Sequence, residues 1–288
     1  MTLLSVIVLS YNTWDLTKKC LLSVIDNYKE DIDKGKIELI LADNGSSDGT
    51  IDEIRRSRFL EKIKIVENDK NYGFGKGNNL AFKKAEGKYI LFLNSDTVSK
   101  DKDFLKMIRL LEENTKTGIL GGKMINSDGS KQLSAGKFYT PWNLFLSLLG
   151  FENFVRSAPD KISRVDWVSG ACLMIRADLF EKLKGFDENF FMYVEDMELC
   201  YRAKKEGFLT YFYPNIKLEH RQAGSSNRQF AIKNIYKGLL YFYKKHGNFL
   251  SYSVIKSMLY SKACLLVIIG RTINNKYLYN TYSQALKI

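Results

Sequence analysis

The chain has 288 residues, of which 45% are hydrophobic and 26% are charged, as in a globular protein with a sizeable core in one large or two small domains. Only three prolines occur, which argues against long disordered linkers, and the four cysteines form no C-x-x-C pair and no zinc-binding spacing. We therefore expect buried, reduced thiols of a cytosolic protein.

The first part of the chain alternates between strand and helix patterns. Apolar, β-branched runs predict strands at 4–9, 38–42, 63–67 and 89–93. The intervening segments predict helices over 15–27, after the turn DNGSSDGT, over 77–85 behind a glycine-rich turn at 73–77, and over 102–114. This order predicts an α/β fold with a mainly parallel sheet, right-handed crossovers and helices on both faces.

Polar residues follow three of these predicted strands. They are Tyr11 with Asn12, Asp43 with Asn44, and Asn94 to Asp96. Ligands of such sheets bind beyond the carboxyl ends of the strands, so these residues are expected to share one site.

The pattern changes from about residue 118 onward. Short strands are predicted at 118–121, 165–168, 171–175 and 209–213, with a hairpin turn at Asp128 and Gly129. Residues 137–160 mix aromatic and apolar residues without a period, which we interpret as a flexible loop on the acceptor side. A helix is predicted over 195–206.

Three kinds of polar residue are candidates for chemistry, and each has a structural alternative. Asp96 ends an apolar strand, where a carboxylate can bind a hard divalent ion or serve as a turn or helix cap. Glu195, Asp196 and Glu198 follow the apolar run FFMYV; they can complement a helix dipole or, in apolar surroundings, act as a base. His220 can be structural or a ligand for manganese or zinc, and Arg221 beside it can meet a diphosphate.

The segment NYGFGKGNN at 71–79 offers three glycines and a lysine that can approach phosphates or sugar closely. It is not the P-loop pattern G-x-x-x-x-G-K-[ST]. It follows the third strand rather than the first, which argues against a dehydrogenase.

Seven motifs in order make the chain resemble the family 2 glycosyltransferases of the GT-A fold, and within them the bacterial rhamnosyltransferase-like branch. The motifs cover roughly residues 4–226; they are SVIVLSYN (5–12), LADNGSSDGT (41–50), NYGFGKGNN (71–79), LNSD (93–96), VSGACLMIRADLF (168–180), GFDENFFMYVEDMELCYRAKKEG (185–207), and His220 with GSS (224–226).

The resemblance implies a role for each matching residue. Asp196 would be the catalytic base, with Glu195 placing the acceptor or donor. Asp96 and His220 would bind Mg²⁺ or Mn²⁺ at the diphosphate, although Asn94 replaces the first acid of the usual Asp-x-Asp. The nucleotide-sugar would contact Tyr11, Asn12, Asp43, Asn71, Gly73, Gly75, Lys76, Asn79, Asn94, Ser95 and Asp96, and the acceptor would contact Trp167, Gly170, Ala171 and Glu195.

The implied reaction is an inverting transfer of L-rhamnose from dTDP-L-rhamnose to a hydroxyl of a lipid-linked or polysaccharide acceptor. A transferase of UDP-hexose or UDP-N-acetylhexosamine is the alternative, followed by a non-catalytic nucleotide-sugar-binding protein. A nucleic-acid-binding protein is suggested by the basic, tyrosine-rich end of the chain, but the acidic motifs argue against it.

Charge divides the chain near residue 226. After Glu219 there is no acidic residue but eleven Lys and Arg, which account for all but one of the net +12 charges. We therefore expect a GT-A domain at 1–226, with a nucleotide-binding half at 1–122 and an acceptor-binding half at 123–226. A helical C-terminal region follows at 227–288.

The C-terminal region is expected to hold two amphipathic helices. One apolar stripe comprises Ile232, Ile235, Tyr236, Leu239, Leu240 and Tyr243, and the other Val254, Ile255, Met258, Leu259, Leu265, Leu266 and Ile269. The stripes can lie on an anionic membrane surface, pack on the catalytic domain, or form a homodimer contact.

We expect a cytoplasmic protein that is peripheral at the inner face of the cell membrane. No secretory signal is expected, because the chain enters a strand pattern at once without a basic leader. No uninterrupted apolar stretch reaches the length of a membrane span, since Lys256, Lys262 and Arg271 interrupt the second stripe.

Overall fold

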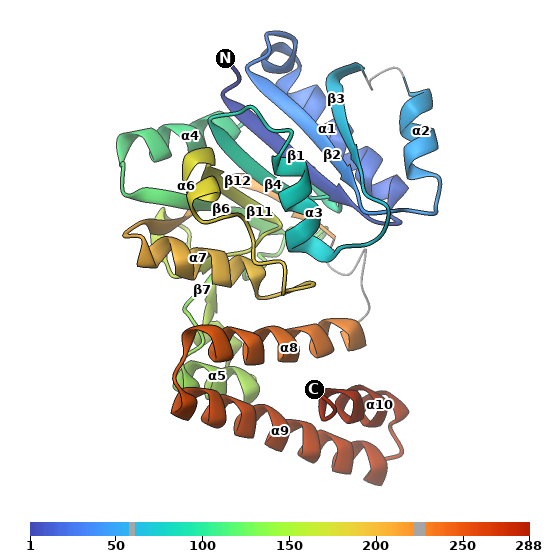
Figure 1. Ribbon diagram of the computed structural model, residues 1–288, viewed down its shortest axis with the longest axis vertical. Helices are drawn as coiled ribbons and strands as arrows, with labels where there is room; N and C mark the ends of the chain where they lie inside the picture. Colours follow the sequence, from blue (N-terminus) through green and yellow to red (C-terminus); the bar gives the residue numbers. More distant parts are fainter. Residues whose placement is uncertain (58–60, 222–227) are drawn as a thin grey trace.

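The computed structural model describes residues 1–57, 61–221 and 228–288 (Figure 1). The strands are β1 (Leu4–Ser10), β2 (Ile37–Asp43), β3 (Ile63–Glu67), β4 (Tyr89–Asn94), β5 (Thr97–Ser99), β6 (Thr117–Ile125), β7 (Ala135–Gly136), β8 (Arg156–Ser157), β9 (Ser163–Val165), β10 (Trp167–Val168), β11 (Cys172–Arg176) and β12 (Leu209–His220). The helices are α1 (Trp14–Asp33), α2 (Thr50–Arg56), α3 (Gly73–Phe82), α4 (Phe104–Glu113), α5 (Pro141–Leu148), the 3₁₀ helix η2 (Glu152–Phe154), α6 (Ala177–Lys182), α7 (Glu195–Lys205), α8 (Arg228–His246), α9 (Phe249–Thr272) and α10 (Lys276–Ala285).

The central sheet has the strand order β3-β2-β1-β4-β11-β6-β12-β5, with β9 also paired to β12. The half formed by β3, β2, β1 and β4 is parallel, as predicted, whereas β11 runs antiparallel to both β4 and β6. Apolar clusters cover both faces of the sheet, one including α1 and α4 and the other α3, α6, α7 and α8. The predicted α/β fold is confirmed, with a mixed sheet.

Two segments differ from the sequence prediction. The glycine-rich segment is not a turn before a helix, because α3 already begins at Gly73. Residues 137–160 are not an irregular loop: they include α5, η2 and β8, and β8 joins β7 and β10 in a second, small sheet. The Thr140 side chain accepts a hydrogen bond from Asn143 N and Pro141 opens α5, so local capping defines this helix.

The C-terminal helices lie at one end of the molecule, with α8 between the catalytic sheet and α9 (Figure 1). The predicted stripe of α8 packs on the catalytic part, since Tyr236, Leu239, Leu240 and Tyr243 are buried in the same cluster as α7. Beneath it the fully buried Glu198 of α7 accepts hydrogen bonds at 2.7 Å from Lys245 and pairs at 2.9 Å with His246. Of the three alternatives for the first stripe, packing on the catalytic domain is therefore the one that the structure supports.

The stripe predicted for α9 is correct only in part. Ile255 and Leu259 are buried, but Leu265 is exposed, and the inward face continues through Ala263 and Gly270 instead. By length and composition, α9 is the one helix of the described residues that could cross a membrane, and 22% of its apolar window is buried. The sequence had not indicated such a helix because basic residues interrupt its apolar run.

Candidate functional site

The carboxyl ends of β1 and β2 are tied together by hydrogen bonds of short polar side chains. Asn12, in a left-handed conformation, donates its backbone N–H to Ser46 Oγ at 2.8 Å. Its side-chain oxygen accepts from Ser47 N at 2.7 Å, while Ser46 N donates to Asp43 Oδ2 at 2.8 Å. Tyr11 beside them is 39% exposed. These hydrogen bonds thus hold the DNGSSDGT segment beside Tyr11 and Asn12.

Asp43 has an unused hydrogen-bond acceptor. The side chain is 2% exposed, and its second oxygen, Oδ1, has no partner among the described residues. A buried carboxylate oxygen without a donor costs free energy, so it marks a place where a ligand N–H fits.

The carboxyl end of β4 brings Asp96 against the end of β12. Thr13 Oγ1 and Ser95 Oγ lie 3.2 Å apart, which joins this edge to the β1 end. His220 Nε2 lies 3.2 Å from Asp96 Oδ1, and both side chains are nearly buried. Arg221 N donates to Asp96 O at 3.0 Å, whereas the Arg221 side chain is exposed. Residues 224–226, the GSS of the predicted motif, lie outside the described residues.

Gln132 orients the imidazole of His220. Its Nε2 donates to His220 O at 2.6 Å and to Asn126 Oδ1 at 2.7 Å, so Oε1 must face His220 Nδ1, 2.7 Å away. Nδ1 therefore carries a proton, and Nε2 is the ring nitrogen that faces Asp96. A histidine whose other ring nitrogen donates to an oxygen in this way is prepared to bind a metal.

Asp96 and His220 fit a divalent ion as a pair of ligands. One carboxylate oxygen and one imidazole nitrogen suit Mn²⁺ or Mg²⁺ whose other positions are taken by diphosphate oxygens and water. No cluster of three or more His, Cys, Asp or Glu with this capacity occurs in residues 1–57, 61–221 and 228–288. The described part of the chain thus offers two protein ligands, fewer than a metal ion needs.

Asp196 reaches the same edge through the residues before β11. Asn94 N donates to Ala171 O at 3.1 Å, and Gly170 N donates to Asp196 Oδ2 at 2.9 Å. A side chain on Gly170 would come within 2.9 Å of the Phe74 ring, so glycine allows this close approach. Asp196 is partly exposed, and burial raises the pKa of its carboxyl, although the hydrogen bonds from Gly170 and Met197 and the positive charge of Arg156 oppose the rise.

Glu195 has a different environment from Asp196. It is 4% exposed, its Oε2 has no partner among the described residues, and burial with the adjacent Asp196 raises its pKa to about 8. Tyr193 and Val194, directly before it, both have positive φ angles, of 71° and 77°. Such a conformation is costly for a β-branched residue and occurs where packing holds a functional turn in place.

The structure explains the glycine-rich segment by packing. A side chain on Gly73 would lie 2.0 Å from Phe191 O, and one on Gly75 would lie 3.0 Å from Phe186 Cβ. Asn71 accepts from Gly73 N and from Asn44 Nδ2. The segment brings α3 against the approach to α7, and donor contacts by its residues stay a prediction.

Three of the predicted site residues make their contacts away from the carboxyl ends of the parallel strands. Lys76 pairs with Glu188 at 3.3 Å, and Asn79 exchanges hydrogen bonds with the backbone of Phe186. Trp167 is buried and donates to Lys137 O at 3.0 Å. Their roles toward donor or acceptor are not tested by these contacts.

The sequence does not indicate Gln132 or Arg156 as residues of the site. Gln132 lies 88 residues from His220, and no pattern in the sequence links the two. Arg156 lies in the stretch interpreted as a loop; its guanidinium is 5.6 Å from the Trp167 ring and its buried Nε has no partner among the described residues. A lone arginine in an aperiodic stretch is the only signal for it.

Comparisons with known proteins agree with this arrangement. The model of Glycosyl transferase family 2 matches residues 5–183, more than half of the chain. The rhamnosyltransferase WbbL of Escherichia coli is 31% identical over 175 residues, which cover 56% of this chain and 65% of that protein. The N-acetylglucosaminyl-diphospho-decaprenol L-rhamnosyltransferase of Mycobacterium tuberculosis is 27% identical over 220 residues, covering 67% and 69%.

A third relative, the low-salt glycan biosynthesis hexosyltransferase Agl10 of Haloferax volcanii, is 26% identical over 195 residues, 64% of this chain. The match spans 61% of the length of Agl10, so the relatives extend beyond the shared region. Among solved structures, the mannosyltransferase PcManGT of Pyrobaculum calidifontis in complex with GDP-Man and Mn²⁺ is similar with a TM-score of 0.59 and 16% identity, covering 98% of this chain and 84% of that one. Its likeness supports the GT-A fold, and the family match shows that this chain belongs to glycosyl transferase family 2.

Proposed function

We propose that the protein is an inverting, nucleotide-sugar-dependent glycosyltransferase with Asp196 as its general base. One observation carries the proposal: hydrogen bonds between neighbouring strand ends, together with covalently adjacent residues, link Asp43, Asp96 with His220, and Asp196 along the sheet edge. We infer that these residues form one site, with an oxygen that accepts a hydrogen bond from the nucleobase, a pair of metal ligands and a partly exposed base. A non-catalytic binding protein would have no need for the base.

Each group has a place in a direct displacement. Asp196 accepts the proton of the acceptor hydroxyl as its oxygen attacks the anomeric carbon, and the nucleoside diphosphate leaves from the opposite face. The carboxylate is held ready by the N–H groups of Gly170 and Met197. A single displacement inverts the configuration at the anomeric carbon.

The leaving diphosphate requires positive charge, which a divalent ion would supply as a Lewis acid. Asp96 and His220 would hold the ion, and Gln132 would keep the imidazole in the tautomer that exposes Nε2. The Mn²⁺ in the complex of PcManGT supports this assignment.

For the donor, we propose dTDP-L-rhamnose, which the names of the two rhamnosyltransferase relatives support. The unpartnered Oδ1 of Asp43 suits the ring N–H that thymine and uracil share. A UDP-hexose or UDP-N-acetylhexosamine is therefore the alternative, favoured by the similarity in fold to TarS of S. aureus in complex with UDP-GlcNAc, with a TM-score of 0.59 and 19% identity over 99% of this chain.

For the acceptor, we propose a lipid-linked glycan at the inner face of the cell membrane. The M. tuberculosis relative carries a diphospho-decaprenol acceptor in its name. The basic C-terminal helices support a place at an anionic surface.

The test is a donor screen that measures release of nucleoside diphosphate in the presence of a lipid-linked acceptor. Turnover with dTDP-L-rhamnose, loss of turnover with EDTA, and recovery with Mn²⁺ or Mg²⁺ are expected. Turnover with a UDP-sugar alone would replace the donor, and no turnover with any nucleotide-sugar would refute the proposed function.

A further inference from the structure

Helices α5 and α9 and the 3₁₀ helix η2 expose an unusual number of large apolar side chains. Trp142 is 64% exposed, Phe154 66% and Ile268 61%. We call the set the α5–α9 surface; it comprises Trp142, Phe145, Leu149, Phe151, Phe154, Leu265 and Ile268. Apolar side chains gathered in this way mark a place that something apolar covers.

The elements that carry the α5–α9 surface pack against one another. The rings of Trp142 and Phe145 stack at 5.7 Å, and α5 packs against η2 and α9. Lys262 of α9 donates to Leu148 O at 2.9 Å, and Leu265 follows three residues later on the same side of α9. The apolar surface therefore continues from α5 onto α9.

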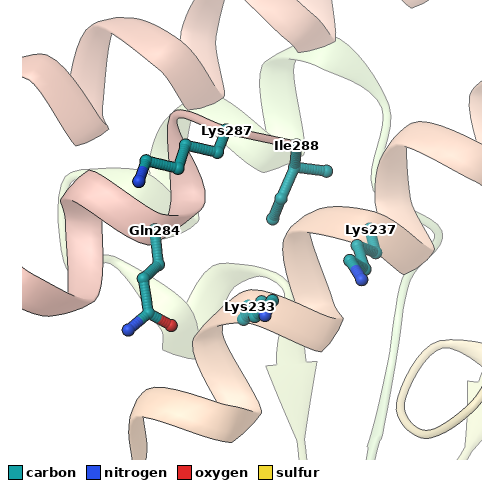
Figure 2. A pocket seen from close by; sticks show the side chains of 5 residues that line it. All are labelled: Lys233, Lys237, Gln284, Lys287 and Ile288. Carbon is teal, nitrogen blue, oxygen red and sulfur yellow. The ribbon is translucent and has the colours of Figure 1, made fainter.

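The C-terminal helices, to which α9 belongs, are strongly basic. No acidic residue follows Glu219, and Glu152 is the one acid of residues 137–157. Figure 2 shows Lys233, Lys237 and Lys287 around a cavity of about 380 Å³ between α8 and α10, with Gln284 and Ile288 as its other lining residues. An apolar face carried in part by a region rich in lysine and arginine matches a bilayer that contains anionic lipid.

The same charge argues against a second copy as the occupant. A symmetric dimer through this surface would bring two sets of C-terminal lysines and arginines together, with only Glu152 of residues 137–157 and no acidic residue after Glu219 to pair with them. Tryptophan and tyrosine also favour the headgroup level of a membrane, where an apolar ring meets water.

The segment that carries the aromatic rings also borders the proposed base. Tyr139 precedes α5 and Arg156 follows η2, and the charges of Arg156 and Asp196 act on each other. The ends of this segment thus lie within electrostatic range of Asp196, and its middle carries the exposed rings.

We propose that the α5–α9 surface docks the protein on an anionic bilayer, with α9 lying along it, so that a lipid-linked acceptor reaches Asp196 directly from the membrane. The delivery of acceptor rests on the proposed function, whereas the docking does not. The packing of α9 against α8 and α10, together with Lys256 and Lys262 within it, favours a surface position over a span.

The test measures co-sedimentation of the full chain with phosphatidylcholine vesicles and with vesicles in which about a third of the lipid is phosphatidylglycerol. The full chain should bind the anionic vesicles and be released by alkaline extraction. The double variants Trp142→Ser with Phe154→Ser, and Leu265→Ser with Ile268→Ser, should each lower partitioning by about tenfold or more. The double variant Arg271→Glu with Lys276→Glu should also lower partitioning by about tenfold or more. The matched control Lys83→Glu with Lys84→Glu changes the C-cap of α3 and the residue after it, and should leave partitioning unchanged.

Four results would overturn the docking proposal: no binding of the full chain at low salt, unchanged binding of both apolar variants, resistance to alkaline extraction, or a dimer in light scattering that the apolar variants dissociate. Each variant is also assayed for transfer to a water-soluble acceptor analogue, where wild-type turnover is expected. Loss of vesicle binding with intact transfer separates a failure of docking from a failure of the proposed function.

Discussion

Two adjacent carboxyl groups at the start of α7 differ in what opposes the effect of burial. Burial raises the pKa of Asp196, but two backbone hydrogen bonds and the positive charge of Arg156 oppose this rise and favour the ionised form. Glu195 is buried with an unpartnered oxygen, which favours its protonated form. The surroundings therefore leave Asp196 as the base and Glu195 as the neutral member of the pair.

This assignment predicts how stability depends on pH at Glu195. Between its ordinary pKa of 4.5 and the folded value of about 8, the folded protein retains a proton that the unfolded chain has lost. Stability of the wild type should therefore fall as pH rises through this window. Glu195→Gln removes that term, so its melting temperature relative to wild type should rise from about pH 5 to about pH 8. A difference in melting temperature between Glu195→Gln and wild type that stays constant across this pH range would contradict the assignment.

The role of Gln132 gives a second prediction at this scale. Gln132→Leu removes the acceptor for His220 Nδ1–H but leaves both proposed metal ligands in place. The Mn²⁺ concentration for half-maximal activation should rise by about 10- to 100-fold. Asn126→Ala, which removes only the outer partner of Gln132, is the matched control and should have a smaller effect. An unchanged Mn²⁺ titration of Gln132→Leu would show that the tautomer does not matter.

At the scale of elements, the buried strands could be predicted because their side chains form uninterrupted apolar runs. Strands predicted at 4–9, 38–42, 63–67 and 89–93 correspond to β1, β2, β3 and β4. The polar residues at three of these strand ends also come together as expected, because parallel strands end at one edge.

The elements that could not be predicted depend on contacts far along the chain. The glycines of α3 looked like loop residues, yet Gly73 and Gly75 lie in a helix packed against residues 186–191. In α5 the apolar residues have no helical period because several of them, including Trp142, face outward. The pairing of His220 with Gln132 joins β12 to the hairpin after β6, which no local pattern encodes.

Gly238 of α8 packs closely against the strained turn before α7, and a substitution can test whether this close packing matters for activity. A Cβ at Gly238 would lie 2.9 Å from Val194 Cγ2 and 3.0 Å from Tyr193 O. Alanine inside a helix is normally stabilising relative to glycine, by about 0.5–1 kcal/mol. Gly238→Ala should instead displace the turn and lower turnover by about tenfold, since small shifts of a catalytic group are costly. The control is Lys237→Ala, at the exposed neighbouring position. Higher stability with full turnover in Gly238→Ala would contradict this role.

At the scale of the whole molecule, the C-terminal helices belong to the architecture of the site. Glu198, one helical turn after Glu195, is fully buried and bonded to Arg202, Lys245 and His246, so α8 is joined to the helix that bears the proposed base. The shift in charge near residue 226 could be seen in the sequence, but this buried network could not. Binding of α9 to a membrane would thus fix the orientation of the catalytic edge.

The central claim is that Asp196 deprotonates the acceptor at a site where the nucleotide-sugar is bound separately. The most direct measurement compares wild type and Asp196→Asn in single-turnover transfer, with donor affinity measured by calorimetry on both proteins. The account predicts a loss of about a hundredfold or more in the transfer rate, with unchanged donor affinity. Transfer by Asp196→Asn at the wild-type rate would contradict it.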